Sequence, residues 1–473
     1  MIADLKPYAE YKESNQTWIG MVPAHWPVLP NRAIFSEVKD RNHPDEEMLS
    51  VTITKGIIQQ KALLAGSSKK DSSNLNKSAY KLVCPRDLAY NKMRAWQGAI
   101  GVSEFRGIIS PAYVVMRLRE NYNPRYFHHL YRTTHFAKEA ESWSYGITSD
   151  MWSLRPEHFK MIYTPLPSVD EQAAIVRFLD YVNHRIDRAI RAKKKVIALL
   201  NEQKQVIIHR AVTRGLDPNV SLKPSGIPLL GDIPKHWEVR PLKHWAKLNS
   251  RTLTDRASPE YEFRYLDIGT VGTGRLVREP VRIKFKQAPS RARRVLRQGD
   301  TIISTVRTYL KAVYFVDILD TDLVASTGFA VLSPGPDVLP EFLSIGVQSS
   351  AFIDRVTANS IGIAYPAIAE YRLGAFHLAI PPDKAEQAAI LQYVRSSSSP
   401  FDTTIARTER EIALLREYRT RLIADVVTGK MDVREAAKKL PEETVESGII
   451  DEDEILSGDE EMEESLEEER KEA

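Results

Sequence analysis

Two stretches of the chain carry apolar residues at alternating spacings of three and four, the pattern of a helix that packs along one seam. They run from about Ile186 to Arg214 and from about Phe401 to Gly429, and they align without a gap at an offset of 215 residues. Six of the eight heptad core positions are apolar in each stretch, and the polar positions coincide. The pattern predicts a seam formed by Ile186, Ile190, Ile197, Leu200 and Ile207 in the first helix and by Ile405, Ile412, Leu415 and Leu422 in the second.

These two helices could pair as a coiled coil or could pack separately, each on its own domain. Their length and their coinciding polar positions favour pairing. At about 1.5 Å per residue such a helix spans roughly 43 Å, so domains at opposite ends of an antiparallel pair could reach sites about one DNA turn, roughly 34 Å, apart. The run Ser396–Pro400 suits a loop and the start of the second helix.

Two segments of similar length, Pro27–Leu166 and Glu238–Pro381, carry the pattern of β-strands instead. Runs rich in β-branched residues are separated by Gly and Pro residues. Examples are LSVTITKGIIQQ and AYVVMRL in the first segment and DTIISTVR and KAVYFVDI in the second. A short helix is predicted near PRYFHHLYRTTHFAKEAES in the first segment and near PEFLSIGVQSSAFIDRV in the second. Each segment is therefore expected to mix a sheet with a few short helices.

The chain also repeats itself. Ile19–Pro30 (IGMVPAHWPVLP) matches Leu230–Pro241 (LGDIPKHWEVRP) at an offset of 211, and EQAAI occurs at both Glu171 and Glu386. Inside the strand-rich segments SPAYVVM matches STGFAVL and SYGI matches SIGI, both at an offset of 216. A duplication of this size predicts two similar domains related by a pseudo-two-fold axis.

Length and composition fit this picture. The 473 residues suffice for two or three domains. No apolar run approaches the roughly 18–20 residues of a membrane span, and the N-terminal residues lack the apolar core of a signal peptide. We therefore expect a cytoplasmic protein with no membrane partner. A single cysteine, Cys84, excludes an internal disulfide framework.

The formal net charge of +4 combines two opposite parts. Residues 441–473 carry 16 acidic and 2 basic side chains, so the remaining residues carry 46 acidic and 64 basic ones, a net charge of +18. A body this basic suggests a polyanionic partner, although it also suits an ordinary basic soluble protein. The tail is most simply a solvated disordered or frayed helical segment, and the alternative is that it competes with nucleic acid for the basic body.

The search for catalytic motifs is negative for the common classes. The chain has no P-loop, no HExxH zinc motif and no GxSxG nucleophile elbow. The lone Cys84 cannot build a zinc site. The sequence predicts that this chain itself binds no cofactor and no metal.

Basic residues interleaved with aromatic ones occur at corresponding places in the two segments. YNKMRAW (Tyr90–Trp96) and STVRTYLK (Ser304–Lys311) each follow a predicted strand, and an offset of 213 pairs Arg94 with Arg307 and Trp96 with Tyr309. Such side chains suit phosphates and base edges, or they could be core aromatics with arginines that cap a strand. The shared arginines favour phosphate contact or a scaffold role, whereas the unshared neighbours favour specificity; these neighbours are Lys92, Gln97, Thr308 and Lys311.

Taken together, these features resemble the specificity subunit of type I restriction–modification systems. The resemblance rests on the G-x-x-P-x-H-W element at Gly20–Trp26 and Gly231–Trp237, on PSVDEQ and PDKAEQ at Pro167 and Pro382, and on the heptad helix after each. It covers about Tyr8–Leu440, and the acidic tail is not part of the pattern.

The resemblance implies an α+β fold: two similar strand-rich target-recognition domains separated by a pair of long antiparallel coiled-coil helices, with a pseudo-two-fold from internal duplication. The expected parts are a first target-recognition domain (1–166), a central repeated region with a spacer helix (167–237), a second target-recognition domain (238–381), a C-terminal repeated region with a spacer helix (382–440) and an acidic, disordered tail (441–473).

The function that the resemblance implies is non-catalytic recognition of double-stranded DNA, with each domain reading half of a bipartite site. The helices would set the spacing and dock two modification subunits, adenine-N6 methyltransferases that supply the S-adenosylmethionine site. Restriction subunits would add the ATP/Mg-dependent and nuclease activities. The outer helix faces could then meet partner helices or DNA through Lys193, Lys194, Lys195, Arg416, Arg419 and Arg421. The alternatives are a self-contained DNA-modifying or DNA-cleaving enzyme with an unrecognised site, and a coiled-coil scaffold with no role on DNA.

Overall fold

The structure is a computed structural model that describes residues 5–64, 77–146, 152–227, 230–318, 322–362 and 365–441. It divides into unit 1, made of Met1–Lys193 and Arg410–Ala473, and unit 2, made of Lys194–Glu409. Each unit holds one strand-rich part and one half of each long helix. The acidic tail that the sequence predicts lies outside the described residues, except for Pro441. Within the described part of the chain, no helix combines the length and the apolar character that crossing a membrane requires.

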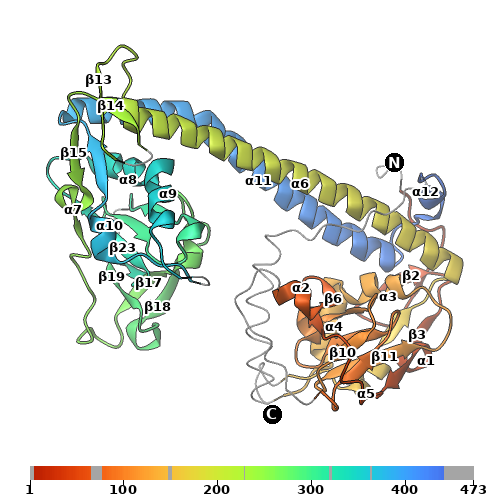
Figure 1. Cartoon of the computed structure of the whole chain (residues 1–473). Helices are drawn as coiled ribbons and strands as arrows, with labels where there is room; N and C mark the ends of the chain where they lie inside the picture. Colours follow the sequence, from red (N-terminus) through yellow and green to blue (C-terminus); the bar gives the residue numbers. More distant parts are fainter. Residues whose placement is uncertain are drawn as a thin grey trace. The chain divides into compact units, whose positions relative to one another are not determined.

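The two long helices, α6 (Val169–Arg214) and α11 (Lys384–Val427), lie side by side and run antiparallel (Figure 1). In unit 1, Asp187 pairs with Arg419 and Lys193 pairs with Glu411, each at 2.6 Å, so the partner number falls as the α6 number rises. In unit 2, Lys204 pairs with Asp402 at 2.6 Å. The predicted antiparallel coiled coil is confirmed.

The predicted seam lies between these helices. Five of its residues are buried and the other four are partly covered: Ile186, Ile190, Ile405, Ile412 and Leu422 belong to the first group and Ile197, Leu200, Ile207 and Leu415 to the second. The assignment of Lys193 and Arg419 to the outer faces is wrong, because both reach across to an acid of the opposite helix. Three of the four polar heptad positions, Lys193, Lys204 and Arg419, therefore carry ion pairs between the helices, which favour one register. The fourth, Thr408, donates to the Thr404 carbonyl of its own helix.

The expectation of a loop at Ser396–Pro400 is wrong as well. Helix α11 continues through Pro400, and the hydroxyl of Thr404 donates to the Pro400 carbonyl at 2.8 Å. A proline inside a helix removes one backbone hydrogen bond and disfavours the helix by about 3 kcal/mol. Burial of apolar residues of α11 on both sides of Pro400, Val394 in the core of unit 2 and Ile405 in the seam, outweighs this local preference.

The strand-rich part of unit 1 is built on a four-stranded antiparallel sheet with the order β4-β11-β8-β9. Small two-stranded sheets β1-β2, β12-β3, β5-β6 and β10-β7 surround it. The strands are β1 (Tyr11–Glu13), β2 (Met21–Pro23), β3 (Val28–Pro30), β4 (Phe35–Val38), β5 (Leu49–Thr52), β6 (Gly56–Gln59), β7 (Lys81–Val83), β8 (Leu88–Asn91), β9 (Ile100–Val102), β10 (Gly107–Ile109), β11 (Tyr113–Leu118) and β12 (Tyr163–Pro165).

Short helices complete unit 1 (Figure 1). They are α1 (Asn31–Ile34), α2 (Gln60–Leu64), α3 (Pro124–Tyr131), α4 (Thr134–Ser142), α5 (Pro156–Met161) and α12 (Arg434–Lys438). The single helix predicted over residues 124–142 is two helices, because Thr133 caps α4 by accepting a hydrogen bond from the Phe136 amide. The core beneath them is aromatic: the ring of Phe127 packs 5.2 Å from that of Phe35, and Tyr131 lies 4.5 Å from Phe136.

Unit 2 repeats this plan. Its antiparallel sheet β16-β23-β20-β21 corresponds to β4-β11-β8-β9, and the pairs β13-β14 and β15-β24 correspond to β1-β2 and β3-β12. These strands are β13 (Leu222–Pro224), β14 (Asp232–Pro234), β15 (Glu238–Pro241), β16 (Ala246–Leu248), β20 (Thr301–Ser304), β21 (Val313–Phe315), β23 (Phe329–Pro334) and β24 (His377–Ile380). The helices are α7 (Leu242–Trp245), α8 (Pro340–Gln348), α9 (Ser350–Ala358) and α10 (Glu370–Gly374).

The two units differ in the middle of their strand-rich parts. Unit 2 has a second four-stranded sheet, β18-β17-β22-β19, in which β17 and β22 run parallel. Its strands are β17 (Glu262–Leu266), β18 (Val281–Lys284), β19 (Ala292–Val295) and β22 (Leu323–Ser326). The scaffold of sheet and helices is thus kept while the inserted strands diverge, as the sequence offsets predict.

The duplicated Glu-Gln pair explains how each long helix holds its strand-rich part. The amide of Gln172 accepts from the Asn123 backbone at the start of α3 and donates to the Pro167 carbonyl, both at 2.8 Å. In unit 2 the amide of Gln387 likewise accepts from the Leu339 backbone at the start of α8 and donates to the Pro381 carbonyl. These glutamines satisfy backbone groups that a helix end leaves open.

The glutamate of each pair binds the duplicated His-Trp element. Glu171 contacts His25 at 3.1 Å, and Glu386 contacts His236 at 2.8 Å while it accepts from the Trp237 indole at 2.9 Å. The conspicuous sequence repeats are therefore structural joints within each unit.

Candidate nucleic-acid interface

The candidate residues of unit 1 lie in the loop between β8 and β9, which includes the 3-10 helix η2 (Ala95–Gln97). Trp96 donates from its indole to the Met93 carbonyl at 2.8 Å, and its ring packs edge-to-face on Trp152 at 5.6 Å. The Lys92 carbonyl accepts from the Leu154 backbone at 2.9 Å. The loop is therefore tied to the segment that follows helix α4.

The candidate residues of unit 2 lie in the corresponding loop between β20 and β21, with η6 (Thr308–Leu310) at the same offset of 213 from η2. Here too the loop is tied to the segment after the helix pair. Val306 and Ile361 both form backbone bridges with Ala367, and the Thr308 hydroxyl donates to Ser360 at 2.8 Å. Both units thus bring together the same two loops, which we call the loop pair: 91–98 with 144–146 and 152–154 in unit 1, and 305–311 with 359–362 and 365–367 in unit 2.

The loop pair of unit 2 presents aromatic and cationic side chains to solvent. Tyr309 is 49% exposed and Ile361 71% exposed. The guanidinium of Arg307 lies 4.7 Å from the centre of the Tyr365 ring, a cation–π contact that holds both groups at the surface. Lys311 is exposed and lies 3.6 Å from Asp354.

Arg307 and Lys311 have φ values of 51° and 52°, in the left-handed region that disfavours side chains other than glycine. Backbone strain of this kind costs of order 1 kcal/mol per residue and gathers at functional sites. These two residues flank η6 at its N-cap and C-cap, and both side chains are exposed.

The structure separates the predicted site residues by their exposure. Gln97, Arg307, Tyr309 and Lys311 are exposed, and Lys92 and Trp96 are partly covered. Arg94 is only 6% exposed and Thr308 only 3%. Burial favours the scaffold alternative for Arg94. Thr308 is unsuited to the specificity role expected for it, because its hydroxyl is already bound to Ser360.

The structure shows further exposed residues in the loop pairs and shortly after the loop pair of unit 2 along the chain. In unit 2, Tyr365 of the loop pair is 52% exposed and Tyr371 of helix α10 is 77% exposed. In unit 1, Tyr145 is 60% exposed and its ring packs 5.1 Å from that of His158. The sequence does mark Tyr145 and Ile361, because they are the positions at which SYGI and SIGI differ, whereas no repeated motif marks Tyr365 and Tyr371.

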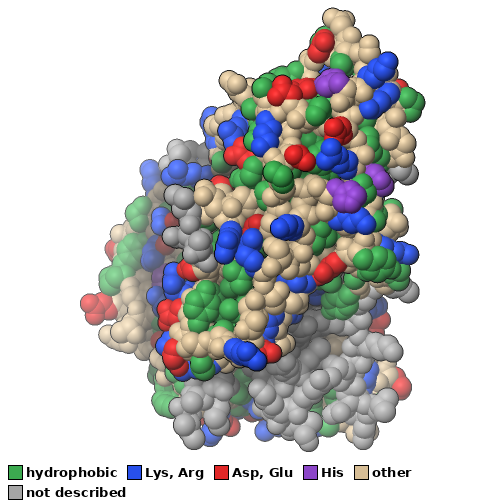
Figure 2. Space-filling model, turned by 90° about the vertical axis from the view of Figure 1, so that its left-hand side faces the viewer, with side chains coloured by type: hydrophobic (Ala, Val, Ile, Leu, Met, Phe, Trp, Pro, Cys, Tyr) green, Lys and Arg blue, Asp and Glu red, His purple; other side chains and the backbone are tan. Residues whose placement is uncertain are grey.

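Net charge alone does not locate an interface. On the face in Figure 2, Lys and Arg side chains are interspersed with Asp and Glu side chains. In the second sheet of unit 2, Asp322 pairs with Arg264 at 2.6 Å and with Arg282 at 3.1 Å. Many cations are therefore neutralised within the chain, which leaves the loop pairs as the better-defined candidates.

We compared the chain with protein-family models, with curated proteins and with solved structures. No protein-family model matches the chain. By sequence it is 25% identical over 246 residues to the putative type I restriction enzyme MjaX specificity subunit of Methanocaldococcus jannaschii. The match covers 48% of this chain and 55% of the relative, so the chain spans about half the length of the curated relative that it matches.

Solved structures give a fold match over most of the chain. A chain from work on the complex assembly and conformational transition of the type I R-M system has a TM-score of 0.53 at 14% identity, over 86% of this chain and 98% of that one. The HsdS subunit from Thermoanaerobacter tengcongensis gives a TM-score of 0.37 at 15% identity, over 87% and 98%, which is too low to add to the argument. The predicted fold class and the predicted resemblance are confirmed: the chain has the fold of a type I restriction–modification chain and is similar to the specificity subunits of these systems.

Proposed function

We propose that this chain is the non-catalytic DNA-recognition subunit of a type I restriction–modification complex. Each unit reads one half of a bipartite site in double-stranded DNA through its loop pair. The observation that carries the proposal is the loop pair itself: two units with one scaffold hold the same two loops together and present different side chains on them. Two domains that recognise different half-sites need the same scaffold to hold the loops and different side chains to contact the bases.

The exposed side chains suit this task. Arg and Lys bind phosphates and guanine edges, and amide side chains bind adenine edges. Arg307 and Lys311 supply cations in unit 2, and Gln97 supplies an amide in unit 1. Aromatic groups such as Tyr309 pack on sugars or bases.

The coiled coil of α6 and α11 sets the gap between the half-sites and docks two modification subunits and the restriction subunits. S-adenosylmethionine, ATP and magnesium belong to those partners in this proposal. The complex works in the cytoplasm, where its DNA substrate lies.

The experiment co-expresses the chain with its modification subunits and maps methylated bases across a genome. The expected result is one bipartite sequence with a constant gap. Tyr309→Ala should relax the half-site read by unit 2 only, and Gln97→Ala the other half-site only. Exchange of Pro27–Leu166 for another recognition domain should replace one half-site and keep the other.

A matched control is Gln203→Ala, because Gln203 is an exposed residue of α6 and belongs to neither loop pair. Methylation or cleavage by the purified chain alone would instead support a self-contained enzyme. A purified chain whose DNA affinity does not fall with rising salt would contradict the proposal, since phosphate contacts release counterions.

A further inference from the structure

Beside each loop pair lies a third loop, a tight turn that connects two paired chain segments. In unit 1 it comprises residues 53–55 between β5 and β6, and the pairing of Thr52 with Gly56 closes it. In unit 2 it comprises residues 272–275, and an antiparallel bridge between Val271 and Leu276 closes it. The DNA contacts proposed for the loop pairs involve neither turn.

The third loop of unit 1 is held by Arg132, which follows the last residue of α3. Its guanidinium donates to five backbone carbonyls, those of Thr52, Ile53, Thr54, Gly98 and Ile100. The bonds to Thr54 and Ile100 measure 2.5 and 2.9 Å. A guanidinium is always charged and spreads its donors over a plane, so it can bridge several acceptors at once. Arg132 therefore fixes the third loop against the loop 91–98, to which Gly98 belongs.

Two glycines allow the close approach that this arrangement needs. A Cβ built on Gly101 of β9 would lie 3.1 Å from the Cα of Gly56 of β6, and a Cβ built on Gly56 would lie 3.0 Å from His128 Cε1. Gly56 also has a φ of 75°, a conformation that glycine adopts without steric cost. The place of the third loop in unit 1 therefore depends on Gly56 and Gly101 as well as on Arg132.

Unit 2 holds its third loop at the same place with different groups. The offset of 213 that relates the loop pairs also pairs Ile100 of β9 with Val313 of β21. The Val313 carbonyl accepts from the Gly274 amide of the third loop at 2.7 Å. The Thr273 hydroxyl donates to the carbonyl of Lys311, a residue of the loop pair, at 2.8 Å. Both units thus attach a third loop to the same strand position and next to the loop pair.

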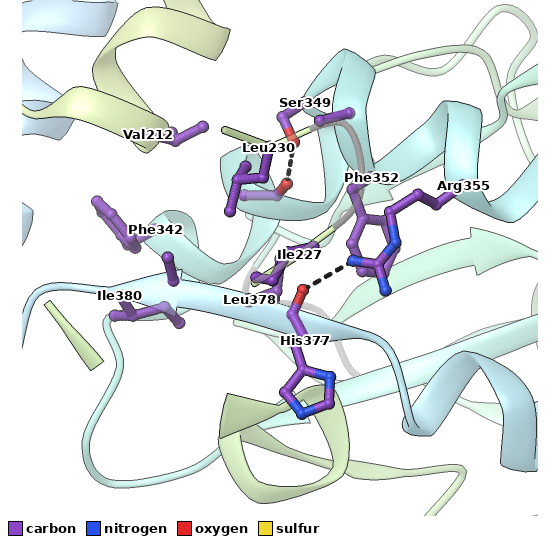
Figure 3. Close-up of a pocket in the computed structure, with 13 residues that line it drawn as sticks. Val212, Ile227, Leu230, Phe342, Ser349, Phe352, Arg355, His377, Leu378 and Ile380 are labelled. Atoms are coloured by element: carbon purple, nitrogen blue, oxygen red, sulfur yellow. Dashed lines mark hydrogen bonds between the residues drawn. The ribbon is translucent and has the colours of Figure 1, made fainter. Parts of the chain in front are cut away.

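The helix pairs support the third loops in both units. Helices α3–α4 and α8–α9 align without a gap at an offset of 216, which pairs Arg132 with Gln348. A Cβ built on Gly274 would lie 2.6 Å from Gln348 Oε1, so Gln348 lies against the third loop of unit 2. The pair α8–α9 is in turn joined to the scaffold, since Arg355 donates to the His377 carbonyl of β24 at 3.1 Å (Figure 3).

Each third loop carries a cation. Lys55 of unit 1 is partly covered and follows the exposed Thr54, and Arg275 of unit 2 is exposed. The Arg275 guanidinium lies 2.9 Å from the Glu409 carboxylate of α11, in an ion pair whose arginine side chain is 55% exposed. An exposed ion pair is weak, so it does not prevent Arg275 from binding a phosphate instead. Phosphate contacts beside a reading loop fix the orientation of a protein on the duplex.

We propose that the third loop of each unit binds the DNA backbone beside the half-site, and that Arg132 is the residue that positions this loop in unit 1. Lys55 and Arg275 contact phosphates and so orient the loop pair of their unit on the duplex. Arg132 touches no DNA and acts through the third loop. This inference rests on the proposed function, in which the loop pairs read the two half-sites.

The first test measures DNA binding by the complex of the full chain with its modification subunits, over a salt series, on duplex DNA that carries the mapped site. Lys55→Ala and Arg275→Ala should each weaken binding several-fold and reduce the salt slope by about one. Lys12→Ala is the control, because Lys12 is an exposed residue of β1 outside these loops. Salt slopes of both loop variants equal to that of the wild-type complex would overturn the proposal.

Glu409→Gln separates DNA contact by Arg275 from its ion pair with α11. Removal of the competing carboxylate should keep the affinity for DNA or raise it. A loss of affinity equal to that of Arg275→Ala would mean that only the ion pair matters, and would overturn the contact in unit 2.

The second test is a double-mutant cycle on the positioning role. In Arg132→Lys a compact ammonium replaces the planar guanidinium and cannot bridge five carbonyls. It should weaken DNA binding several-fold in the wild-type background but less than about twofold in Lys55→Ala, because both substitutions remove the same contact. Equal losses in the two backgrounds would overturn the positioning role.

Arg119→Lys is the matched control for stability. The Arg119 guanidinium also donates to two backbone carbonyls of unit 1, those of Arg32 and Phe35, each at 3.1 Å. Its substitution should leave the salt slope unchanged. Failure of the proposed function looks different, because the wild-type complex would then give neither a bipartite methylated site nor salt-dependent DNA binding.

Discussion

At the scale of single residues, the chain depends on a few buried polar groups that join its elements. Gln387 is fully buried, and its amide contacts backbone groups of three residues: Leu339, Asp337 and Pro381. We predict that Gln387→Ala lowers the free energy of unfolding by about 1–3 kcal/mol, because it leaves buried backbone groups unpaired. Denaturant unfolding measures this, and the exposed Gln203→Ala should change stability by less than about 0.5 kcal/mol. Equal effects of the two substitutions would contradict the structural role.

Lys81 on β7 is the second group at this scale. Its ammonium donates to the Tyr113 carbonyl, and burial, with Lys92 and Arg41 nearby, lowers its pKa from 10.5 to about 8. Between pH 8 and 10.5 the unfolded chain then binds more protons than the folded one, so the free energy of unfolding rises with pH. We predict that the wild-type chain gains stability relative to Lys81→Met over this range. The comparison is denaturant unfolding at pH 7.5 and 9.5, with the exposed Lys195→Met as the control; the same pH dependence in both variants would contradict the assignment.

At the scale of elements, helix α11 retains a proline that its local sequence disfavours. We predict that Pro400→Ala raises the free energy of unfolding by about 1–3 kcal/mol, because it restores a backbone hydrogen bond inside the helix. Part of the gain is offset by the greater freedom of the unfolded chain. Thermal unfolding followed by circular dichroism measures the effect, and Ser399→Ala is the matched exposed control. A lower stability of Pro400→Ala would argue against a continuous helix.

At the scale of the whole molecule, charge is distributed unevenly along the chain. Removal of residues 442–473 takes away 16 acidic and 2 basic side chains and leaves a formal net charge of +18. We predict tighter DNA binding at low salt and a steeper decline with rising salt, because the acidic residues no longer compete with phosphates. Filter binding or anisotropy over a salt series measures both. A tail of scrambled sequence and equal charge should restore the original behaviour, and identical salt slopes with and without the tail would contradict the idea.

Local sequence was sufficient for the repeating features of this protein. The heptad pattern identified the seam at Ile186, Ile405 and Ile412, because burial along a helix leaves a regular spacing. The duplicated motifs identified two similar units. Identical residues form equivalent contacts in each unit, as Gln172 and Gln387 do with the backbone at the start of the helix pair. The interleaved basic and aromatic residues pointed to loops that occupy corresponding places in the two units.

Contacts between residues far apart in the chain determined which side chains are buried and where helix α11 continues. Ser360 lies 52 positions from Thr308 and Tyr365 58 positions from Arg307, and these contacts determine which side chains of the loop are covered and which are presented. Pairing with a second helix kept α11 intact through Pro400 against its local preference, and directed Lys193 and Arg419 inward to ion pairs that spacing alone placed on the outside. Burial is a property of the assembled elements, so the pattern along the chain could indicate the candidate loops but could not separate their exposed residues from their supporting ones.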